Sequence, residues 1–365
     1  MEPIPFMQTA FDQVDAKVVF KEVQSGFVGP GITVNEFGNK LKNEIQRNFS
    51  QLTTSGTVAL SVAVLAAGLK NGDEILVPSY GVISTIHAFS SIGLIPRLVD
   101  INISTGSITL KEILNSITPK TKAICYVNFA GNTGKDLVEI EKFCKESNLI
   151  LIEDAACAMG NSFCGRMAGS FGNISTFSLS APKIITTGQG GVLLTNEEHM
   201  MSRVNEIIDL GDMEWRKTNF NRGIGSNLRY TNIQAAFGMS QLSSLRKKLN
   251  HRKKVFEQLK GKLEQNIFSP DGNEAPLFNI ILSDKRKEIQ QFLKIKQVSS
   301  VIQYRAIYEH PPYHDLKIKK FYGAEYWSKN ALFLPFGNGL SIKQSKFIAS
   351  ILEKFKSALH NFEKI

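Results

Sequence analysis

Lys183 is the residue of this sequence that is best placed to act as a nucleophile. It lies in the segment 176–191, between small polar residues such as Ser178 and a glycine-rich turn that ends at Gly191. Glycine lets a backbone pass close to a ligand, and a lysine in a partly desolvated pocket loses basicity and attacks carbonyl carbons. The segment therefore predicts a lysine that binds a carbonyl cofactor covalently. The competing interpretation is a solvated lysine before a turn, which is far commoner for a lysine taken alone.

Two acids, Glu153 and Asp154, end the apolar run 149–154. The run predicts a buried strand, and active-site side chains gather at the carboxyl ends of parallel strands. A carboxylate at that position can keep a pyridine nitrogen protonated, because a nearby opposite charge stabilises the cation. Asp154 is therefore predicted to hold a cofactor ring. The alternative is a plain N-cap for the turn that follows.

Two further segments have residues that bind anions. Gly56 and Thr57 directly precede the helix predicted over 58–69, and the unpaired N–H groups and dipole of a helix N-terminus favour a phosphate. Asn227 and Arg229 precede a second predicted helix, and both side chains can donate hydrogen bonds to an anion. In both segments, ordinary helix capping is the alternative.

Strand and helix patterns alternate between residues 55 and 195. Apolar runs predict strands at 74–78, 96–100, 122–127 and 149–154, and helical patterns lie between them. Such alternation predicts an α/β fold, in which a mostly parallel sheet is covered by helices on both faces. Ligands of these folds bind beyond the carboxyl ends of the strands, which is where Asp154 is expected.

A long helical pattern over 231–263 precedes weaker strand and helix signals that begin after residue 269. We expect a large cofactor-binding domain with an N-terminal segment over residues 1–245, and a smaller α+β domain over residues 246–365. Basic residues cluster at 246–254, on the predicted outer face of the long helix. We expect a solvated surface there and no nucleic-acid partner, because no nucleic-acid-binding motif accompanies the cluster.

The composition of the 365-residue chain is that of a globular protein, with 42% hydrophobic residues, 21% charged residues and a formal charge of +10. No apolar window approaches the roughly 20 residues of a membrane span, and the N-terminus does not resemble a signal peptide. We therefore expect a cytoplasmic protein without a membrane partner. The four cysteines form no CxxC pair, which predicts reduced thiols and no metal site.

The order and spacing of these segments resemble the DegT/DnrJ/EryC1/StrS family of sugar aminotransferases that depend on pyridoxal phosphate (PLP), within fold type I. The resemblance runs from about residue 26 to residue 241 and continues faintly to the C-terminus. Further landmarks are the segments 35–37, 72–78 and 169–173. The resemblance implies a fold type I transferase with a mostly parallel sheet of the seven-stranded kind.

The resemblance also implies roles for individual residues. Lys183 matches the family's Schiff-base lysine, and Asp154 matches the aspartate on the pyridine nitrogen. Gly56 and Thr57 match the phosphate-binding turn, and Ser178 matches a serine that adds a hydroxyl to the phosphate.

Three other positions concern the cofactor. Asn227 matches an asparagine that reaches the phosphate in a neighbouring subunit, so the resemblance implies a homodimer with shared active sites. Cys157 stands where the family often has Gln or His near the cofactor's 3-hydroxyl. Val82 stands where an aromatic ring covers the pyridine ring, a role that Tyr80 would take only in a shifted register.

Three positions are candidates for substrate binding. Tyr308 stands in place of the histidine of the family's H-x-Q-P stretch, which contacts the sugar, and His310 is expected to take over that role. Arg229 is the third candidate. The alternative for His310 is a solvated loop histidine.

The implied reaction moves the amino group of glutamate to the 3- or 4-keto carbon of a nucleotide-linked 6-deoxy sugar, and Lys183 moves the proton. A related branch that dehydrates sugars has histidine in place of this lysine, so lysine at position 183 favours transamination. The alternative function is a regulatory protein that binds PLP or a nucleotide sugar without turnover.

Overall fold

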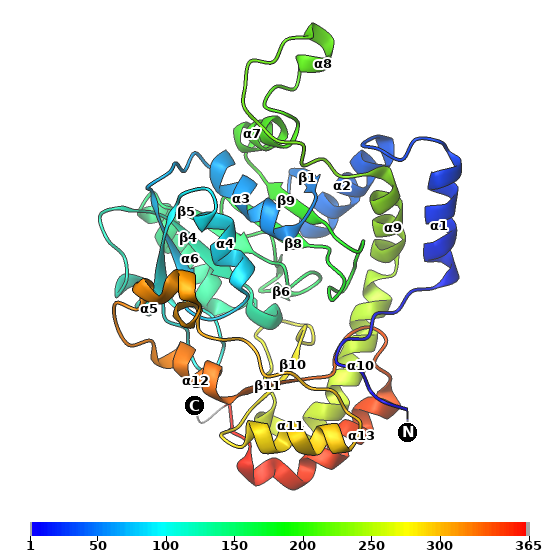
Figure 1. Cartoon of the computed structure of the whole chain (residues 1–365), viewed down its shortest axis with the longest axis vertical. Helices are drawn as coiled ribbons and strands as arrows, with labels where there is room; N and C mark the ends of the chain where they lie inside the picture. Colours follow the sequence, from blue (N-terminus) through cyan, green and yellow to red (C-terminus); the bar gives the residue numbers. More distant parts are fainter. Residues whose placement is uncertain (1, 363–365) are drawn as a thin grey trace.

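A seven-stranded sheet forms the centre of the protein, in a computed structural model that describes residues 2–362 (Figure 1). The strand order is β1-β9-β8-β5-β4-β2-β3. The strands are β1 (Phe49–Thr53), β2 (Glu74–Pro78), β3 (Ile95–Val99), β4 (Thr121–Val127), β5 (Ile150–Asp154), β8 (Ile174–Ser178) and β9 (Gly191–Thr195). β9 runs antiparallel to both of its neighbours, and the other neighbouring pairs are parallel. The predicted α/β fold with a mostly parallel sheet is confirmed.

Helices surround this sheet and bury its central strands. The helices of this part are α1 (Gln13–Gln24), α2 (Ile32–Ile45), α3 (Gly56–Ala66), α4 (Ile83–Ser90), α5 (Leu110–Leu114), α6 (Lys135–Glu146), α7 (Glu198–Ile208) and α8 (Trp215–Thr218). α3 packs across β1, β5, β8 and β9, whereas α6 contacts β5 and α4 contacts β3. Every residue of β2 and β9 is buried. Strands covered on both faces accept apolar side chains at every position, which explains the continuous apolar runs in the sequence.

The helical pattern predicted over 231–263 forms two helices, α9 (Asn232–Ser243) and α10 (Leu245–Leu263), which meet at Ser244. α10 begins in a core cluster beside the large sheet, with Leu245 and Leu249, and ends in a second cluster with Leu259 and Leu263. The helix thus connects the two parts of the chain.

The prediction that the basic residues of α10 lie on its outer face is wrong for Arg252. This side chain is buried and donates a hydrogen bond to the Leu277 carbonyl oxygen at 3.1 Å. Burial lowers the pKa of Arg252 to about 10. The residue lies on the same face as Leu245 and Leu249, because seven and three residues separate it from them along the helix.

The C-terminal part contains a two-stranded antiparallel sheet, β10 (Asn279–Leu282) and β11 (Ala331–Leu334). Its helices are α11 (Arg286–Ile295), α12 (Tyr322–Asn330) and α13 (Ile342–Leu352), and short 3-10 helices include η3 (Ile307–Glu309) and η4 (Pro311–Leu316). The N-terminal Ile4 packs in the same core cluster as β10 and α13. The division into residues 1–245 and 246–365 remains a proposal.

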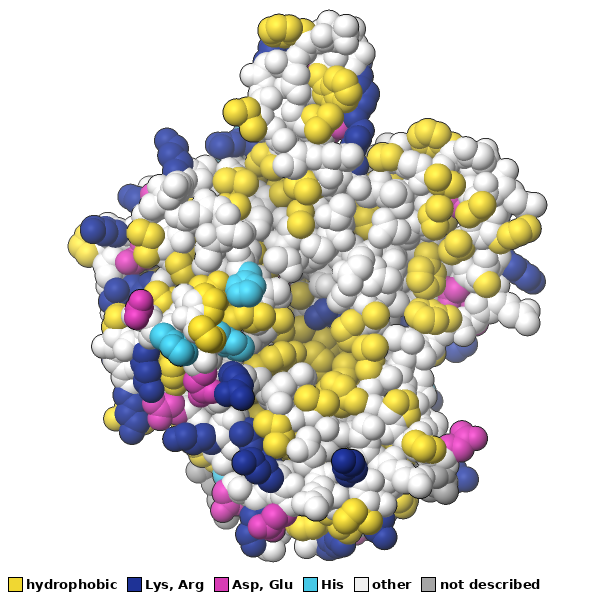
Figure 2. All heavy atoms as spheres, viewed as in Figure 1, with side chains coloured by type: hydrophobic (Ala, Val, Ile, Leu, Met, Phe, Trp, Pro, Cys, Tyr) yellow, Lys and Arg dark blue, Asp and Glu magenta, His cyan; other side chains and the backbone are white. Residues whose placement is uncertain are grey.

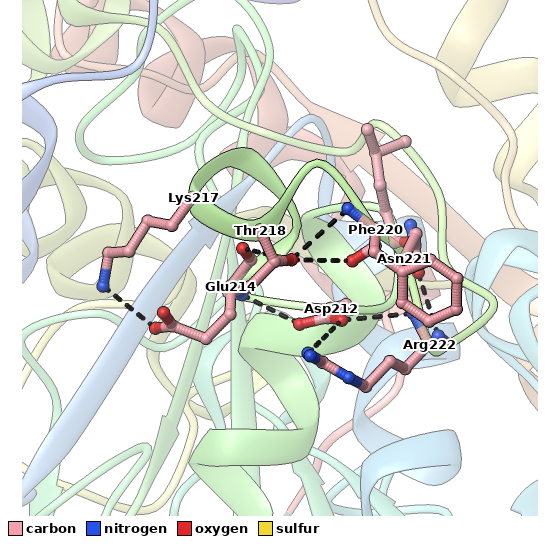
Figure 3. Close-up of polar contacts among 9 residues, drawn as sticks. Asp212, Glu214, Lys217, Thr218, Phe220, Asn221 and Arg222 are labelled. Carbon is pink, nitrogen blue, oxygen red and sulfur yellow. Dashed lines mark hydrogen bonds and ion pairs between the residues drawn. The ribbon is translucent and has the colours of Figure 1, made fainter.

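Residues 210–226 form a segment that projects from the body of the protein between α7 and α9 (Figure 1). Figure 3 shows the polar contacts that fold it: the Asp212 carboxylate accepts hydrogen bonds from the backbone N–H of Glu214 at 2.8 Å and from the Arg222 guanidinium at 3.2 Å. Phe220 and Ile224 are exposed on it, at 64% and 101%. The segment is therefore internally bonded, and it presents apolar side chains outward.

Within residues 2–362, no helix combines the length and the apolar character that a membrane crossing requires. The short antiparallel pair β6 (Ser162–Phe163) and β7 (Arg166–Met167) lies apart from the large sheet.

Candidate active site

A cavity of about 320 Å³ opens at the carboxyl ends of the parallel strands. Val127 at the end of β4, Asp154 at the end of β5 and Ser178 at the end of β8 all line it. Figure 2 shows a hollow lined by hydrophobic side chains on this face of the molecule. Its position agrees with the rule that α/β folds bind ligands beyond the carboxyl ends of their strands.

Lys183 lies in the loop between β8 and β9, and its side chain lines the cavity. Backbone hydrogen bonds close the loop at its base, since the N–H of Leu179 donates to Gly190 at 2.8 Å and the N–H of Thr187 donates to Leu179 at 2.9 Å. The Lys183 Nζ lies 3.3 Å from the Cys157 Sγ. The predicted nucleophile is thus held by a closed loop that returns to the sheet.

Asp154 lies at the floor of the cavity and is almost completely buried. Burial raises the pKa of its carboxyl group. The Thr85 hydroxyl, the Ala156 N–H and the charge of Lys183 act in the opposite direction, and the net shift is upward. The hydrogen bonds to the carboxylate measure 2.9 Å from Thr85 Oγ1 and 3.2 Å from the Ala156 nitrogen. A buried carboxylate with these donors can balance the charge of a protonated ring nitrogen.

The first turn of α3 forms a cradle beside these residues. Ser55 caps the helix by accepting the N–H of Val58 at 3.2 Å, and Gly56 and Thr57 begin it. The first N–H groups of a helix lack partners within the helix and therefore attract anions. A Cβ added at Gly56 would stand 2.9 Å from the Cβ of Ser178. The cradle therefore requires glycine at this position, which brings the helix terminus against the Ser178 side chain.

These residues fit PLP. The buried Asp154 carboxylate suits the pyridine nitrogen, the α3 terminus and Ser178 suit the phosphate, and Lys183 suits the carbonyl carbon. When it is bound, PLP supplies an electron-accepting ring. Among residues 2–362, no cluster of His, Cys, Asp and Glu side chains is arranged to hold a metal ion.

Val82 and Cys157 also line the cavity. Val82 stands at the N-cap of α4 and is 37% exposed. Tyr80 does not replace it, since its side chain is buried outside the cavity: the Tyr80 hydroxyl accepts the N–H of Tyr304 at 2.9 Å and donates to the Gln303 carbonyl oxygen at 3.1 Å. An aliphatic side chain therefore lines the cavity at position 82, where the resemblance implies an aromatic ring.

The other predicted residues lie outside the lining of this cavity. Asn227 accepts a hydrogen bond from the Nε of Arg229 at 2.9 Å, and Arg229 lies 3.4 Å from the Asp209 carboxylate. Tyr308 is buried against Phe321, and its hydroxyl has no hydrogen-bond partner among the described residues. His310 is half-buried in the loop between η3 and η4.

Several residues of the site have little or no signal in the sequence. Thr85 carried one signal, since it is a polar residue in the first turn of the helix that follows β2. Phe129, Phe278 and Tyr304 line the cavity without a local signal. Phe278 and Tyr304 come from the C-terminal part of the chain and meet the cavity only through tertiary packing.

Comparisons with known proteins identify a family and a fold. The sequence profile of the DegT/DnrJ/EryC1/StrS aminotransferase family matches residues 10–353. The chain is 29% identical to the GDP-perosamine synthase of Escherichia coli O157:H7, over 98% of this chain and 100% of that protein. It is 32% identical to the GDP-perosamine synthase of Caulobacter vibrioides, over 79% and 80% of the two chains. The crystal structure of DesV from S. venezuelae superposes with a TM-score of 0.91 and 22% identity, covering 98% of this chain and 99% of DesV.

Proposed function

Because the chain belongs to the DegT/DnrJ/EryC1/StrS aminotransferase family, we propose that it moves the amino group of glutamate to the 3- or 4-keto carbon of a nucleotide-linked 6-deoxy sugar. PLP is its cofactor. One observation carries the proposal: Lys183 and the buried Asp154 line the same cavity, next to a helix terminus suited to a phosphate. The two relatives named above are GDP-perosamine synthases, and each aligns with more than two thirds of this chain. GDP-linked keto sugars are therefore the first substrates to test.

The proposed roles follow from the positions of the side chains. Asp154 stabilises a positive charge on the ring nitrogen, and Lys183 holds and moves the proton at the substrate carbon. A positioned acid–base group of this kind contributes about 10²–10⁴-fold to a rate. The α3 terminus and Ser178 hold the phosphate, and Val82 covers the ring through apolar contact alone. Cys157 contacts the Lys183 amine.

The test combines covalent trapping with a substrate panel. Borohydride reduction of the PLP-loaded protein, followed by peptide mass spectrometry, should locate the cofactor on Lys183. Lys183→Arg, which keeps the positive charge, should neither bind PLP covalently nor aminate a sugar. A GDP-, dTDP- and UDP-linked keto-sugar panel with glutamate then identifies the substrate. Absence of any trapped cofactor would contradict the proposal.

A regulatory protein that binds PLP or a nucleotide sugar without turnover is the second candidate. Val82 and Cys157 favour it, because both stand at cavity positions where the family has other residue types. Glutamate added to the PLP-loaded protein separates the two candidates. A change in the absorbance of the cofactor indicates transamination, and an unchanged spectrum indicates a binding protein.

The proposal includes a homodimer in which Asn227 acts in the neighbouring subunit. Its side chain lies outside the cavity of its own chain, and the projecting segment 210–226 next to it exposes Phe220 and Ile224. Such surfaces are typical of interfaces. Light scattering measures the size of the particle.

Subunit mixing tests whether Asn227 acts across the interface. Lys183→Ala and Asn227→Ala proteins, each inactive alone, form mixed dimers on co-expression. One site of a mixed dimer then has an intact lysine and the partner's asparagine, so activity returns to about a quarter of the normal value for random pairing in a C2 dimer. If Asn227 acts within its own chain, activity does not return.

We also propose that the protein is cytoplasmic. Its four cysteines are free thiols, and two of them, Cys125 and Cys144, are buried. Reduced thiols are typical of cytosolic proteins.

A further inference from the structure

Histidine side chains lie beside the hollow of the active site (Figure 2). His87 lies on α4, His310 lies between η3 and η4, and His314 lies in η4. Electrostatic interactions connect His310 to both of the other histidines. The ring of His87 lies 5.6 Å from the ring of Tyr313, between centroids.

The helix α4 places this histidine cluster next to the cavity. Ser84 and Thr85 of α4 line the cavity, and His87 lies three residues after Ser84. Residues three apart on a helix share a face and lie about 4.5 Å apart along the axis. His87 is therefore about one helical turn farther from the cavity on the same face.

The loop that carries His310 is attached beside the cavity, next to the start of α4. Tyr304 lines the cavity, a backbone bridge joins Ala306 to Tyr80, and the Ile307 N–H donates to the Ser79 carbonyl oxygen at 2.8 Å. The loop is thereby fixed against the segment that leads into α4. The histidine cluster thus forms an outer rim of the cavity and is continuous with its lining.

The charges around the cluster favour an anion. The pKa of His310 is affected by the charges of Arg305 and Glu309 on its own loop. His87 on α4 and His314 in η4 also affect it. Glu309 already accepts a hydrogen bond from the Ser328 hydroxyl at 3.0 Å, and its second oxygen lies 3.9 Å from Arg305. Arg286 on α11 adds a second positive charge near Glu309. The Arg305 side chain is 74% exposed, so most of its N–H groups face solvent.

We propose that His87, His310 and His314, together with Arg305, form the subsite for the diphosphate of the nucleotide-linked substrate. The inference rests on the proposed function, which places the reacting sugar carbon at Lys183. A sugar ring separates that carbon from the diphosphate, so the phosphates must lie outside the cavity lining, and the rim lies there. Imidazolium and guanidinium groups donate charge-assisted hydrogen bonds to phosphate oxygens.

The subsite makes binding depend on pH. Burial lowers the pKa of His310, and the positive charge of Arg305 acts in the same direction. His310 is therefore mainly neutral at neutral pH before a ligand binds. A diphosphate favours the charged imidazolium, so binding takes up protons. The affinity is highest below the His310 pKa of the free protein, and it falls as the pH rises through the higher pKa of the complex.

Calorimetry on the PLP-loaded protein tests the subsite without turnover. GDP, dTDP, UDP and inorganic pyrophosphate are titrated near pH 6 and near pH 8, in two buffers with different heats of ionisation. We expect tighter nucleotide binding at the lower pH, with proton uptake. His310→Asn should weaken binding near pH 6 by about fivefold, the effect of one exposed charge pair, and should reduce the proton uptake. Near pH 8 the same variant should change binding little.

A matched control uses His199, an exposed histidine on α7 that lies 3.5 Å from Glu197. His199→Asn should leave nucleotide binding unchanged. A combined variant, His87→Asn with Arg305→Gln, tests the subsite without altering the half-buried His310, and it should weaken binding at both pH values.

Two outcomes would overturn the subsite: nucleotide binding that is independent of pH, or normal binding of the nucleotides and of pyrophosphate by both rim variants. The outcomes also separate the subsite from the proposed function. Histidine-dependent GDP binding without amination of any keto sugar refutes the function alone. Amination together with histidine-independent binding refutes the subsite alone.

Discussion

The hydroxyl of Thr85 is predicted to keep Asp154 ionised. Thr85 Oγ1 donates to Asp154 Oδ2 at 2.9 Å, and both side chains are buried. Burial raises the pKa of Asp154, and this hydrogen bond is the largest of the effects that lower it. Thr85→Val removes the donor and keeps the shape of the side chain, so the pKa of Asp154 should rise further.

The magnitude follows from the strength of the bond. A hydrogen bond to a charged group is worth about 1.5–3 kcal/mol, which corresponds to about a ten- to hundredfold change in the protonation equilibrium. In its proposed role Asp154 acts as the anion, so the rate should fall as the pH falls through its pKa. A raised pKa therefore moves the acidic limb of the pH–rate profile to higher pH.

The assay is the half-reaction with glutamate, followed by cofactor absorbance from acidic to neutral pH. Thr85→Ser keeps a hydroxyl donor and is the matched control, and thermal melts establish that both variants are folded. Thr85→Val should lose rate about ten- to hundredfold on the acidic side and recover much of it at higher pH. If the acidic limbs of the three proteins coincide, Thr85 does not control the charge of Asp154.

Three other predictions concern the cradle, a buried tyrosine hydroxyl and a buried acid. Gly56→Ala should weaken PLP binding in equilibrium dialysis at least about tenfold, because the added Cβ meets Ser178. The control is Gly261→Ala, which adds a Cβ in open space on α10. It should leave PLP binding unchanged and raise the free energy of unfolding by about 0.5–1 kcal/mol. Tyr80→Phe leaves the buried N–H of Tyr304 without its acceptor, so urea unfolding should show a loss of about 1–3 kcal/mol, and an unchanged midpoint would contradict the contact. Burial raises the pKa of Glu153 to about 7. Because a raised pKa in the folded state favours the protonated form, the stability of the protein should be greatest below the pKa of the unfolded chain and should decline as the pH rises through about 7. Glu153→Gln should abolish this decline in thermal melts across that pH range.

Much of the fold was predictable because its signals are local. Apolar runs at 74–78, 122–127 and 149–154 match β2, β4 and β5 closely, since a strand covered on both faces needs apolar side chains at every position. Lys183 and Gly56 were also singled out by local patterns, and both line the cavity. Each lies in a short segment whose glycines and small polar residues indicate a close approach of the backbone to a ligand.

Other features depend on contacts between distant segments. The long helical pattern breaks at Ser244, between α9, which packs on α1 and α2, and α10, which packs on α13. Arg252 is flanked by basic residues, but it lies on the buried face of α10 and donates a hydrogen bond to the Leu277 carbonyl oxygen, 25 residues away. A one-dimensional pattern records periodicity and not which segment lies above a given side chain.

From the sequence alone we predicted the sheet and proposed Lys183 and Asp154 as site residues, and the resemblance to a known family implied the cofactor. Only the tertiary structure decided that Thr85 bonds to Asp154, that Tyr80 is packed away from the cavity, and that Phe278 and Tyr304 close its wall. Such contacts are chosen by close packing among elements far apart in the chain, where shape and hydrogen-bond geometry must be met together. Local segments of the sequence therefore indicate the candidate reactive side chains, whereas tertiary packing decides which other side chains surround them.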